Sequence, residues 1–453
     1  MTDLAFLMER FRASPDDPAV VWNDSAYSYS WLLEAVRDAD GDLAQRAVDR
    51  GSVVRLEADF SPRSIALFLA LVNRNCIIAP SLRSFAGSAR DTMGAIAEIE
   101  YELAVALDDS IAGFPTGRRA SHDLYQTLRQ REHAGLVLFS SGSTGTPKAA
   151  VHDFGRLLEK FRQRRESLRT LNFLLFDHWG GLNTLLHTLS NGGTVFTIQD
   201  RSPDAVCRLI ESHRIEVLPA SPTFLNLLVL SRAHTRHDLS SLKIVSYGTE
   251  PMPQSLLKRL SEELPWVRLH QTYGLIELGV LRSKSRSNDS VWVKLGGEGF
   301  ETRVVDGLLQ IRAQSAMLGY LNAPSPFTED GWFMTGDAVE VDGDYFRIIG
   351  RASELINVGG EKVYPQEVEG VILEVANVAD VTVFGEKNAI VGNIVCARVR
   401  LLDPEDPDAV TLRVKRYCRE RLPGYKVPVR VTVVHEDQHG ERFKKIRSGP
   451  VSS

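Results

Sequence analysis

Hydrophobic and polar positions along the first third of the chain predict helices and strands in turn. Apolar residues recur at helical spacing over residues 28–50 and, after a short loop, over residues 59–73. A short apolar run at 135–139 ends in a loop rich in Ser, Gly and Thr, which indicates a buried strand. Residues 151–169 return to helical spacing, so we expect a helix there.

The middle of the chain alternates short apolar runs with helical patterns. The expected strands cover residues 173–176, 194–198, 217–218 and 267–271, and the expected helices cover residues 182–189, 203–213, 223–231 and 254–264. Strands that alternate with helices in this way are typical of layered α/β structure.

The pattern changes after residue 292. Short alternating runs at 301–305, 308–312 and 345–349 are separated by Gly, Asn and Asp, which predicts antiparallel strands. Beyond Gly350 we expect a smaller unit. Its helices fall at residues 365–375 and 411–421, and its strands at 378–384, 394–401 and 429–434. A chain of 453 residues is also too long for one ordinary core, so two to four core units are expected.

Composition narrows the possible functions. A net charge of -5 gives no broad basic field, so nucleic acid is not an expected partner. The four cysteines lie far apart in sequence, which gives a zinc site little support and suits a reducing compartment. Residues 1–12 do not resemble a secretory signal, and the most apolar stretch, 65–72, is too short to span a bilayer. We therefore expect a cytoplasmic enzyme without a membrane span.

The strongest chemical signal is the segment from Ser140 to Lys148, which reads SSGSTGTPK. Its glycines allow close approach of the backbone to a ligand, and its hydroxyls, N–H groups and lysine suit phosphate oxygens. It differs from the GxxxxGK[ST] loop of P-loop NTPases. A solvated turn is the simpler interpretation of such a run, but the preceding apolar strand and the final Pro-Lys favour phosphate binding.

This loop resembles the phosphate loop [ST]SG[ST]TGxPKG of the adenylate-forming superfamily, with Ala149 in place of the last glycine. The superfamily comprises acyl- and aryl-CoA ligases, adenylation domains of peptide synthetases and luciferases. Further segments resemble its other motifs in the expected order, over residues 27–447. In sequence order they are HWGG from His178, GTEP from Gly248, YGLIE from Tyr273, TGD from Thr335, GRASE from Gly350 and VGGEKVYP from Val358.

The resemblance implies a role for each motif. The nucleotide-binding residues would be Ser140, Ser141, Gly142, Ser143, Thr144, Gly145, Thr146, Lys148, Gly248, Thr249, Glu250, Tyr273, Gly274, Asp337 and Arg351. Glu277 would hold Mg²⁺, which prefers carboxylate and phosphate oxygens. Residues Tyr247 to Glu250 also match the YG-T-E pattern. They lie just before the helix expected at 254–264, which is the position of the adenine loop in the superfamily. We therefore assign the metal motif to Tyr273 and Glu277.

The resemblance also implies a mobile lid. Ser353 would be the hinge, and Gly359 and Gly360 would line the channel for the thiol of coenzyme A. Lys445 matches the catalytic lysine of the C-terminal tail, with Lys444 as the alternative. A generic basic tail is the simpler interpretation on charge alone. Lys445, Lys148 and His178 are the expected catalytic residues, and His178, Asn183, Tyr247 and Gln271 the expected acyl pocket.

The expected fold is α/β: a large N-terminal domain at residues 1–352, with two α/β sheets and a distorted β-barrel, and a small α+β lid at 353–453. The expected activity is ATP-dependent ligation of a carboxylic acid to coenzyme A through an acyl-adenylate. Three alternatives stay open: loading of a phosphopantetheinyl carrier protein, catalysis of the thioester half-reaction alone, and a non-catalytic nucleotide-binding module. Two departures matter, namely the short chain and Ile276 in place of the threonine of YGxTE.

Overall fold

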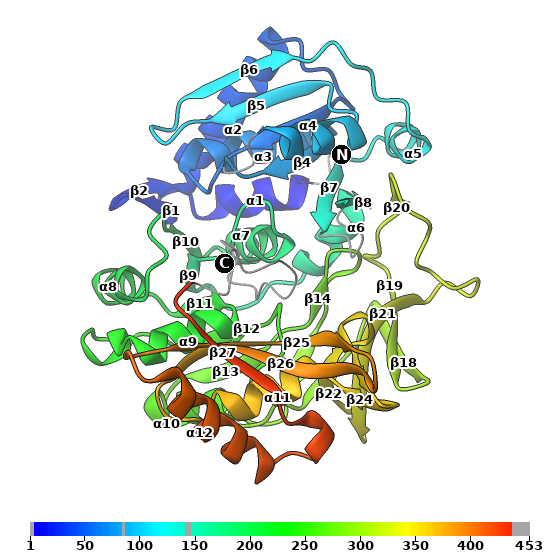
Figure 1. Cartoon of the computed structure of the whole chain (residues 1–453). Helices are drawn as coiled ribbons and strands as arrows, with labels where there is room; N and C mark the ends of the chain where they lie inside the picture. Colours follow the sequence, from blue (N-terminus) through cyan, green and yellow to red (C-terminus); the bar gives the residue numbers. More distant parts are fainter. Residues whose placement is uncertain (1–3, 84–86, 141–145, 437–453) are drawn as a thin grey trace.

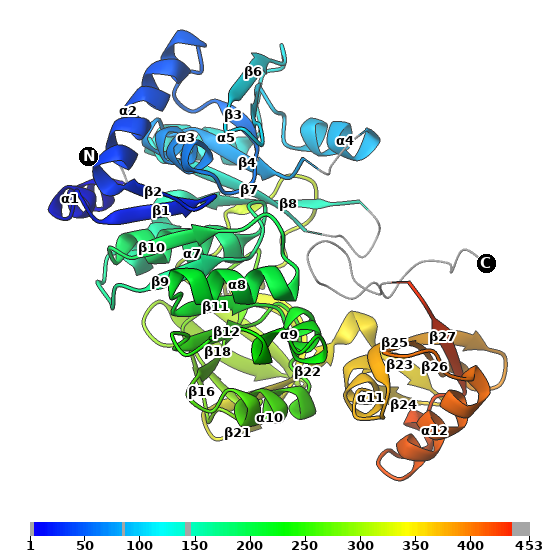
Figure 2. The same cartoon turned by 90° about the vertical axis from the view of Figure 1, so that its left-hand side faces the viewer.

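The computed structural model describes residues 4–83, 87–140 and 146–436 (Figures 1 and 2). Two seven-stranded sheets form the larger part of the molecule. The first sheet has the order β13 (Arg268–Gln271), β12 (Ile244–Tyr247), β11 (Val217–Ala220), β9 (Arg169–Asn172), β10 (Thr194–Thr197), β1 (Pro18–Trp22) and β2 (Ser25–Ser28). The second has the order β20 (Gly319–Tyr320), β8 (Lys148–Asp153), β7 (Gly135–Ser140), β4 (Ile77–Ser81), β3 (Val53–Glu57), β5 (Tyr101–Val105) and β6 (Ile111–Pro115).

Helices cover both sheets and fill the space between them. They are α1 (Ala5–Ala13), α2 (Tyr29–Gln45), α3 (Pro62–Asn73), α4 (Ser88–Ile96), α5 (Asp123–Arg131), α6 (Phe154–Leu158), α7 (Trp179–Ser190), α8 (Pro203–His213), α9 (Pro222–Leu230) and α10 (Gln254–Glu263). Helices α3, α8 and α9 each begin with a serine N-cap followed by proline, because the serine oxygen accepts a backbone N–H and proline needs no partner there.

Two hydrophobic cores hold these layers together. The first core joins α2, α3, α6 and α7 with strands of both sheets, so α7 lies between the sheets (Figure 1). The second core lies on the other face of the first sheet, under α8, α9 and α10. All strands of the first sheet except β2 pair in parallel, so the carboxyl ends of β9, β11, β12 and β13 lie along one edge.

A third, antiparallel sheet follows in the region where the distorted β-barrel was expected. Its order is β16 (Ser283–Ser285), β17 (Val293–Leu295), β22 (Tyr345–Arg351), β21 (Phe333–Asp342), β19 (Leu308–Ala313) and β18 (Phe300–Val305). A short hairpin, β14 (Gly274–Leu275) and β15 (Gly279–Val280), connects it to the first sheet. Strand β20 leaves this region and pairs with β8, which ties the third sheet to the second.

The last part of the chain forms a small unit with its own core, which extends from Ile356 to Val431. It contains β23 (Ile356–Val358), β24 (Glu361–Val363), α11 (Pro365–Ile372), β25 (Val378–Asn388), β26 (Gly392–Leu401), α12 (Pro407–Arg419) and β27 (Arg430–Val434). The described residues also contain four 3₁₀ turns: η1 (Glu159–Phe161), η2 (Ala233–Thr235), η3 (Ala352–Glu354) and η4 (Gly424–Lys426). Among the contacts of the small unit with the rest of the chain, Asn226 of α9 donates from Nδ2 to Ala379 O at 2.9 Å.

Two expected elements are wrong. Residues 151–153 belong to strand β8, because β8 pairs with β7 across the phosphate loop, and the helix that follows ends at Leu158. The strand expected at 173–176 lies earlier, at Arg169–Asn172. Residues 173–176 form a connection that inserts Phe173 into the second core and Phe176 into the first. Buried connections of this kind resemble strands in sequence.

All four cysteines are buried and unpaired. In the part of the chain that the structure describes, no helix has the length and apolar character needed to cross a membrane.

Candidate active site

The predicted phosphate loop connects two antiparallel strands. Ser140 ends β7 and pairs directly with Lys148, the first residue of β8. Asn322 fixes the end of the loop, because its side chain accepts from Ala149 N at 3.1 Å and donates to Pro147 O at 2.8 Å. Thr146 is exposed. Ser141, Gly142, Ser143, Thr144 and Gly145 lie outside the described residues.

Tyr320 of β20 links Lys148 to the predicted metal ligand. Lys148 Nζ lies over the Tyr320 ring, 5.6 Å from its centroid, and the Tyr320 hydroxyl donates to Glu277 Oε1 at 2.5 Å. Burial raises the pKa of Tyr320, and the Glu277 carboxylate raises it further, so the phenol keeps its proton. The structure thus brings together the predicted phosphate lysine and the predicted metal carboxylate.

A second chain of contacts joins the predicted adenine and ribose residues. The Tyr273 hydroxyl donates to Asp337 Oδ2 at 2.5 Å, and Arg351 Nε lies 3.2 Å from Asp337 Oδ1. Asp337 and Arg351 are paired residues of β21 and β22. Burial raises the pKa of the Asp337 carboxyl, while Arg351 and Tyr273 act in the opposite direction. Burial also raises the pKa of Tyr273 well above its usual value, so Tyr273 is the donor.

The predicted adenine loop is fixed against the Tyr273 segment. Thr272 N donates to Tyr247 O at 2.7 Å, and a Cβ added at Gly248 would lie 2.5 Å from Thr272 Oγ1, so only glycine fits there. Thr249 has a φ of 73°, which is strained for a β-branched residue. Glu250 accepts from the Thr223 hydroxyl at 2.6 Å and so anchors the loop to α9.

Buried donors also hold the backbone around Glu277. His152 of β8 contacts Ile276 O through Nε2 at 2.7 Å, Met317 N donates to Glu277 O at 2.8 Å, and the Ser315 hydroxyl donates to Leu278 O at 2.7 Å. The Ile276 side chain packs against the first core and the core of the third sheet. The predicted metal carboxylate is therefore placed by a rigid support.

The four predicted acyl-pocket residues divide between two faces of the first sheet. Tyr247 and Gln271 are paired in β12 and β13, and Tyr247 packs into the second core near α10. His178 and Asn183 belong to α7, on the opposite face. His178 is the N-cap of α7, where its Nδ1 accepts from Gly180 N at 3.0 Å. The structure does not place these four side chains around one point.

The predicted lid residues lie at exposed turns. Ser353 is exposed within η3, directly after β22. Gly359 and Gly360 form the two-residue turn between β23 and β24, with φ values of 61° and 94° that favour glycine in a tight hairpin. Lys445 and the alternative Lys444 lie outside the described residues.

Sequence reasoning missed Tyr320 and His152. Tyr320 follows Gly319 in a short stretch without clear periodicity, so only its pairing with Ala150 of β8 reveals its place. A lone histidine such as His152 carries no pattern in sequence. Its contact with Ile276 joins residues 124 positions apart.

The residues present fit a magnesium ion that is shared with phosphate groups. Glu277 is a single partly buried carboxylate whose Oε1 accepts from Tyr320, and among the described residues Oε2 accepts no hydrogen bond. The described residues contain no cluster of three metal-ligating side chains. A lone carboxylate suits Mg²⁺, which takes few protein ligands and binds substrate phosphates in addition.

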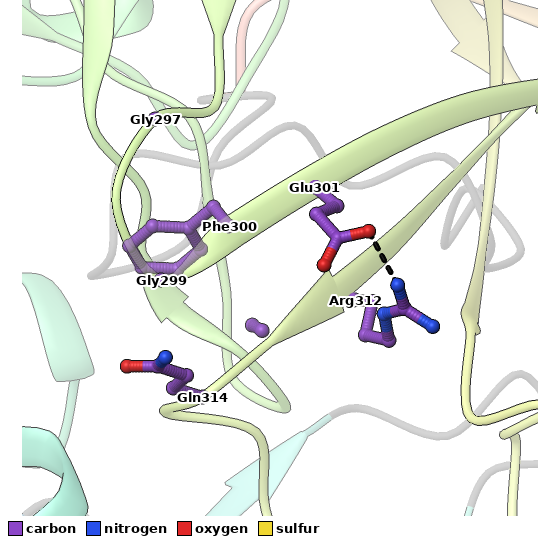
Figure 3. Close-up of a pocket in the computed structure, with 7 residues that line it drawn as sticks. Gly297, Gly299, Phe300, Glu301, Arg312 and Gln314 are labelled. Atoms are coloured by element: carbon purple, nitrogen blue, oxygen red, sulfur yellow. Dashed lines mark hydrogen bonds and ion pairs between the residues drawn. The ribbon is translucent and has the colours of Figure 1, made fainter.

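One hollow of about 430 Å³ lies elsewhere, at the ends of β18 and β19 (Figure 3). Glu301 and Arg312 form an ion pair across these strands, and the rest of the hollow is lined by Gly297, Gly299, Phe300, Ala313 and Gln314. None of its seven lining residues is a predicted site residue. We therefore do not place the active site there.

Comparison with known proteins agrees with this arrangement. Residues 7–320 match the family model of AMP-binding enzymes, and residues 367–449 match the C-terminal domain of AMP-binding enzymes. A 2-succinylbenzoate–CoA ligase of Listeria monocytogenes is 25% identical over 98% of this chain and 97% of its own length. A feruloyl-CoA synthase of an Amycolatopsis species is 31% identical over 65% of this chain and 64% of its own length.

Solved structures share the fold. An anthranilate CoA ligase in complex with anthranoyl-AMP aligns with a TM-score of 0.83 and 18% identity, over 98% of this chain and 95% of that one. The chain spans about two thirds of the length of several curated relatives and nearly all of others.

The chain belongs to the family of AMP-binding enzymes, which confirms the resemblance to the adenylate-forming superfamily. Within it, the chain is an AMP-forming ligase that joins an acid to a thiol.

Proposed function

We propose that this ligase activates an aryl carboxylic acid as its adenylate and transfers the acyl group to coenzyme A. The observation that carries the proposal is the position of the Tyr273–Glu277 segment. At its start Tyr273 contacts Asp337 and Arg351, and at its end Glu277 contacts Tyr320 beside Lys148. A ribose site and a phosphate site at the two ends of one short segment suit a nucleotide that lies along it.

In the first half-reaction a carboxylate oxygen of the acid attacks the α-phosphorus of ATP and pyrophosphate leaves. Lys148 places a positive charge next to the phosphate loop and neutralises charge on the phosphates. Glu277 and the phosphates would hold Mg²⁺, which supplies further charge neutralisation when bound. Asp337 would accept from the ribose hydroxyls, with Arg351 beside it. Catalysis here rests on positioning and charge, with no covalent enzyme intermediate.

In the second half-reaction the thiol of coenzyme A attacks the acyl-adenylate carbonyl and AMP leaves. We assign residues 353–453 to a lid that turns about Ser353 between the two steps, and residues 1–352 to the body. The separate core of residues 356–431 supports this division. The exposed turn at Gly359 and Gly360 has no side chains to obstruct a narrow thiol channel.

Relatives named for 2-succinylbenzoate and for feruloyl-CoA support an aryl acid as the substrate class. A phosphopantetheinyl carrier protein is the alternative acceptor, and a chain limited to the thioester half-reaction is the alternative enzyme. We place the enzyme in the cytoplasm, which suits four unpaired buried thiols.

Release of AMP tests this function. The full chain is incubated with ATP, Mg²⁺, coenzyme A and each member of a panel of aryl and alkyl acids, and AMP is measured with single components omitted. We expect AMP only when acid and ATP are both present, with an acyl-CoA product for at least one aryl acid. No acid-dependent AMP from any acid would contradict the proposal, and AMP with thioester only on a carrier protein would change the acceptor.

A further inference from the structure

Helix α7 is buried on every side except one stripe. Most of its residues are buried, whereas Gly180 and Asn183 are partly buried and His187 is exposed. These three residues are three and four positions apart, so they lie on one face of the helix. The stripe starts beside the predicted catalytic His178 and continues away from it along the helix.

Cationic side chains gather at the far end of this stripe. Lys160 of η1 donates from Nζ to Val280 O at 3.0 Å, and β15, which contains Val280, packs against α7. Desolvation lowers the pKa of His187, and the positive charges of Arg165 and Lys160 also lower it. Arg282, the second residue after β15, extends this cluster. Its positive charge contributes to the lowered pKa of Lys160, and its guanidinium donates to Gln163 Oε1 at 3.4 Å.

The charges of this cluster are incompletely neutralised. Among the described residues, neither Lys160 nor Arg165 has an acidic partner, and only Glu298, which is exposed, pairs with Arg282. Lys160 uses one N–H for Val280, so its ammonium group has two more to donate. Desolvation, together with the charges of Arg165 and Arg282, lowers the pKa of Lys160 to about 7. A bound anion would stabilise the charged form of Lys160 against both the desolvation and the neighbouring positive charges.

Polar groups lie along the same path, and one of their buried atoms has no hydrogen-bond partner among the described residues. Asn183 Oδ1 is buried and has no hydrogen-bond partner within the described ranges. Ser246 and His270 are paired in β12 and β13 and alternate with residues of the second core, so they point toward the α7 side of the sheet. Both are partly buried, and the charge of Arg165 also acts on His270. Unpartnered buried polar atoms in a native protein call for water or a ligand.

We infer that the acid substrate lies along the Gly180, Asn183 and His187 stripe and carries a second anionic group, a carboxylate, that binds Lys160 and Arg165. This inference rests on the proposed function and specifies its substrate class. His178 and His187 are nine positions apart, which is roughly 13 Å along a helix axis. A compact aryl acid with a second carboxylate at its distal end matches that span, whereas a purely apolar chain would leave the cations without a partner.

Equilibrium binding without ATP tests the substrate class separately from catalysis. Calorimetry with the full chain and AMP compares matched acids of similar length: para-carboxyhydrocinnamate with para-methylhydrocinnamate, and suberate with octanoate. We expect the diacid of at least one pair to bind about tenfold tighter or more, the effect of one charge-assisted hydrogen bond. Because no turnover is required, failure to release AMP would count against the proposed function and leave this result standing.

Variants test which residues bind the second carboxylate of the substrate. Lys160→Met should abolish the preference for the diacid, and so should Arg165→Met, whose exposed position tolerates substitution. Binding of the matched monoacid should change less than twofold. Lys258→Met removes an exposed lysine of α10 and is the control, which should keep the preference. Equal affinity for diacid and monoacid in both pairs, or a preference that persists in Lys160→Met and Arg165→Met, would overturn the inference.

Discussion

At the scale of single residues, the site depends on side chains that support the predicted ligands. Tyr320 donates to Glu277 Oε1 and lies beneath Lys148 Nζ, so it orients a carboxylate and a cation at once. Groups that orient metal ligands in this way typically contribute about ten- to 100-fold to metal affinity. Tyr320 is therefore a positioning residue of the proposed metal site.

Tyr320→Phe should raise the Mg²⁺ concentration for half-maximal adenylation about tenfold or more, because Glu277 loses its hydrogen-bond donor. The measurement is a Mg²⁺ titration of acid-dependent pyrophosphate–ATP exchange. Tyr345→Phe, which removes a hydroxyl from β22, is the matched control and should behave as wild type. An unchanged Mg²⁺ requirement in Tyr320→Phe would show that the phenol does not support the metal.

His152 shows how burial couples the site to stability. It is buried in β8, contacts Ile276 O, and its Nδ1 has no partner among the described residues. Burial lowers the pKa of His152 from 6.5 to about 4. The folded protein therefore keeps this imidazole neutral at pH values where the unfolded chain binds a proton.

Stability should consequently fall as the pH decreases from about 6.5 to about 4, where the unfolded state binds the additional proton. This pKa shift limits the contribution of His152 to the change in the free energy of unfolding with pH to at most about 3 kcal/mol. Denaturant unfolding of wild type and His152→Gln over this range measures it, and the free energy of unfolding of the variant should depend less steeply on pH. Parallel profiles for the two proteins would exclude His152 as the cause.

At the scale of elements, most of the fold could be predicted, because helical and alternating patterns are local properties. The pattern failed at residues 151–153 and 173–176, where pairing across the phosphate loop and burial of Phe173 and Phe176 determine the structure. The resemblance supplied Tyr273, Asp337 and Arg351, and the structure brings these three together. Tyr320 and Lys160 were missed, since their partners are distant in sequence.

The turn η3 offers a direct test of the proposed hinge. Ser353 is exposed there, and in this structure its backbone N–H makes no hydrogen bond to a described residue, so proline would mainly restrict φ and the residue before it. Ser353→Pro should slow one half-reaction at least tenfold more than the other, because a hinge absorbs lid motion in a few dihedral angles. Separate rates for adenylation and thioester formation provide the measurement. Equal rates in variant and wild type would place the pivot elsewhere.

At the scale of the whole molecule, the site combines all parts of the fold. The second sheet supplies Lys148, the hairpin after the first sheet supplies Glu277, and the third sheet supplies Asp337. The small unit carries the glycines proposed to line the thiol channel. The order of the motifs along the chain was enough to assign them. Their close approach in the folded protein depends on strand pairings such as that of β20 with β8. Ile276 is the main departure. The Ile276 side chain packs against two hydrophobic cores. The sequence alone therefore could not predict how the missing threonine hydroxyl affects contact with a phosphate.

The central claim is that one active site performs both half-reactions, and separate assays of each half-reaction in wild type and Lys445→Ala test it most directly. Adenylation is followed by acid-dependent pyrophosphate–ATP exchange, and thioester formation by acyl-CoA produced from a presynthesised acyl-adenylate. We predict both activities in wild type and, in Lys445→Ala, exchange slowed by orders of magnitude with thioester formation preserved, because Lys445 would act only on the transferring phosphoryl group. Rapid thioester formation without any exchange in wild type would contradict the claim.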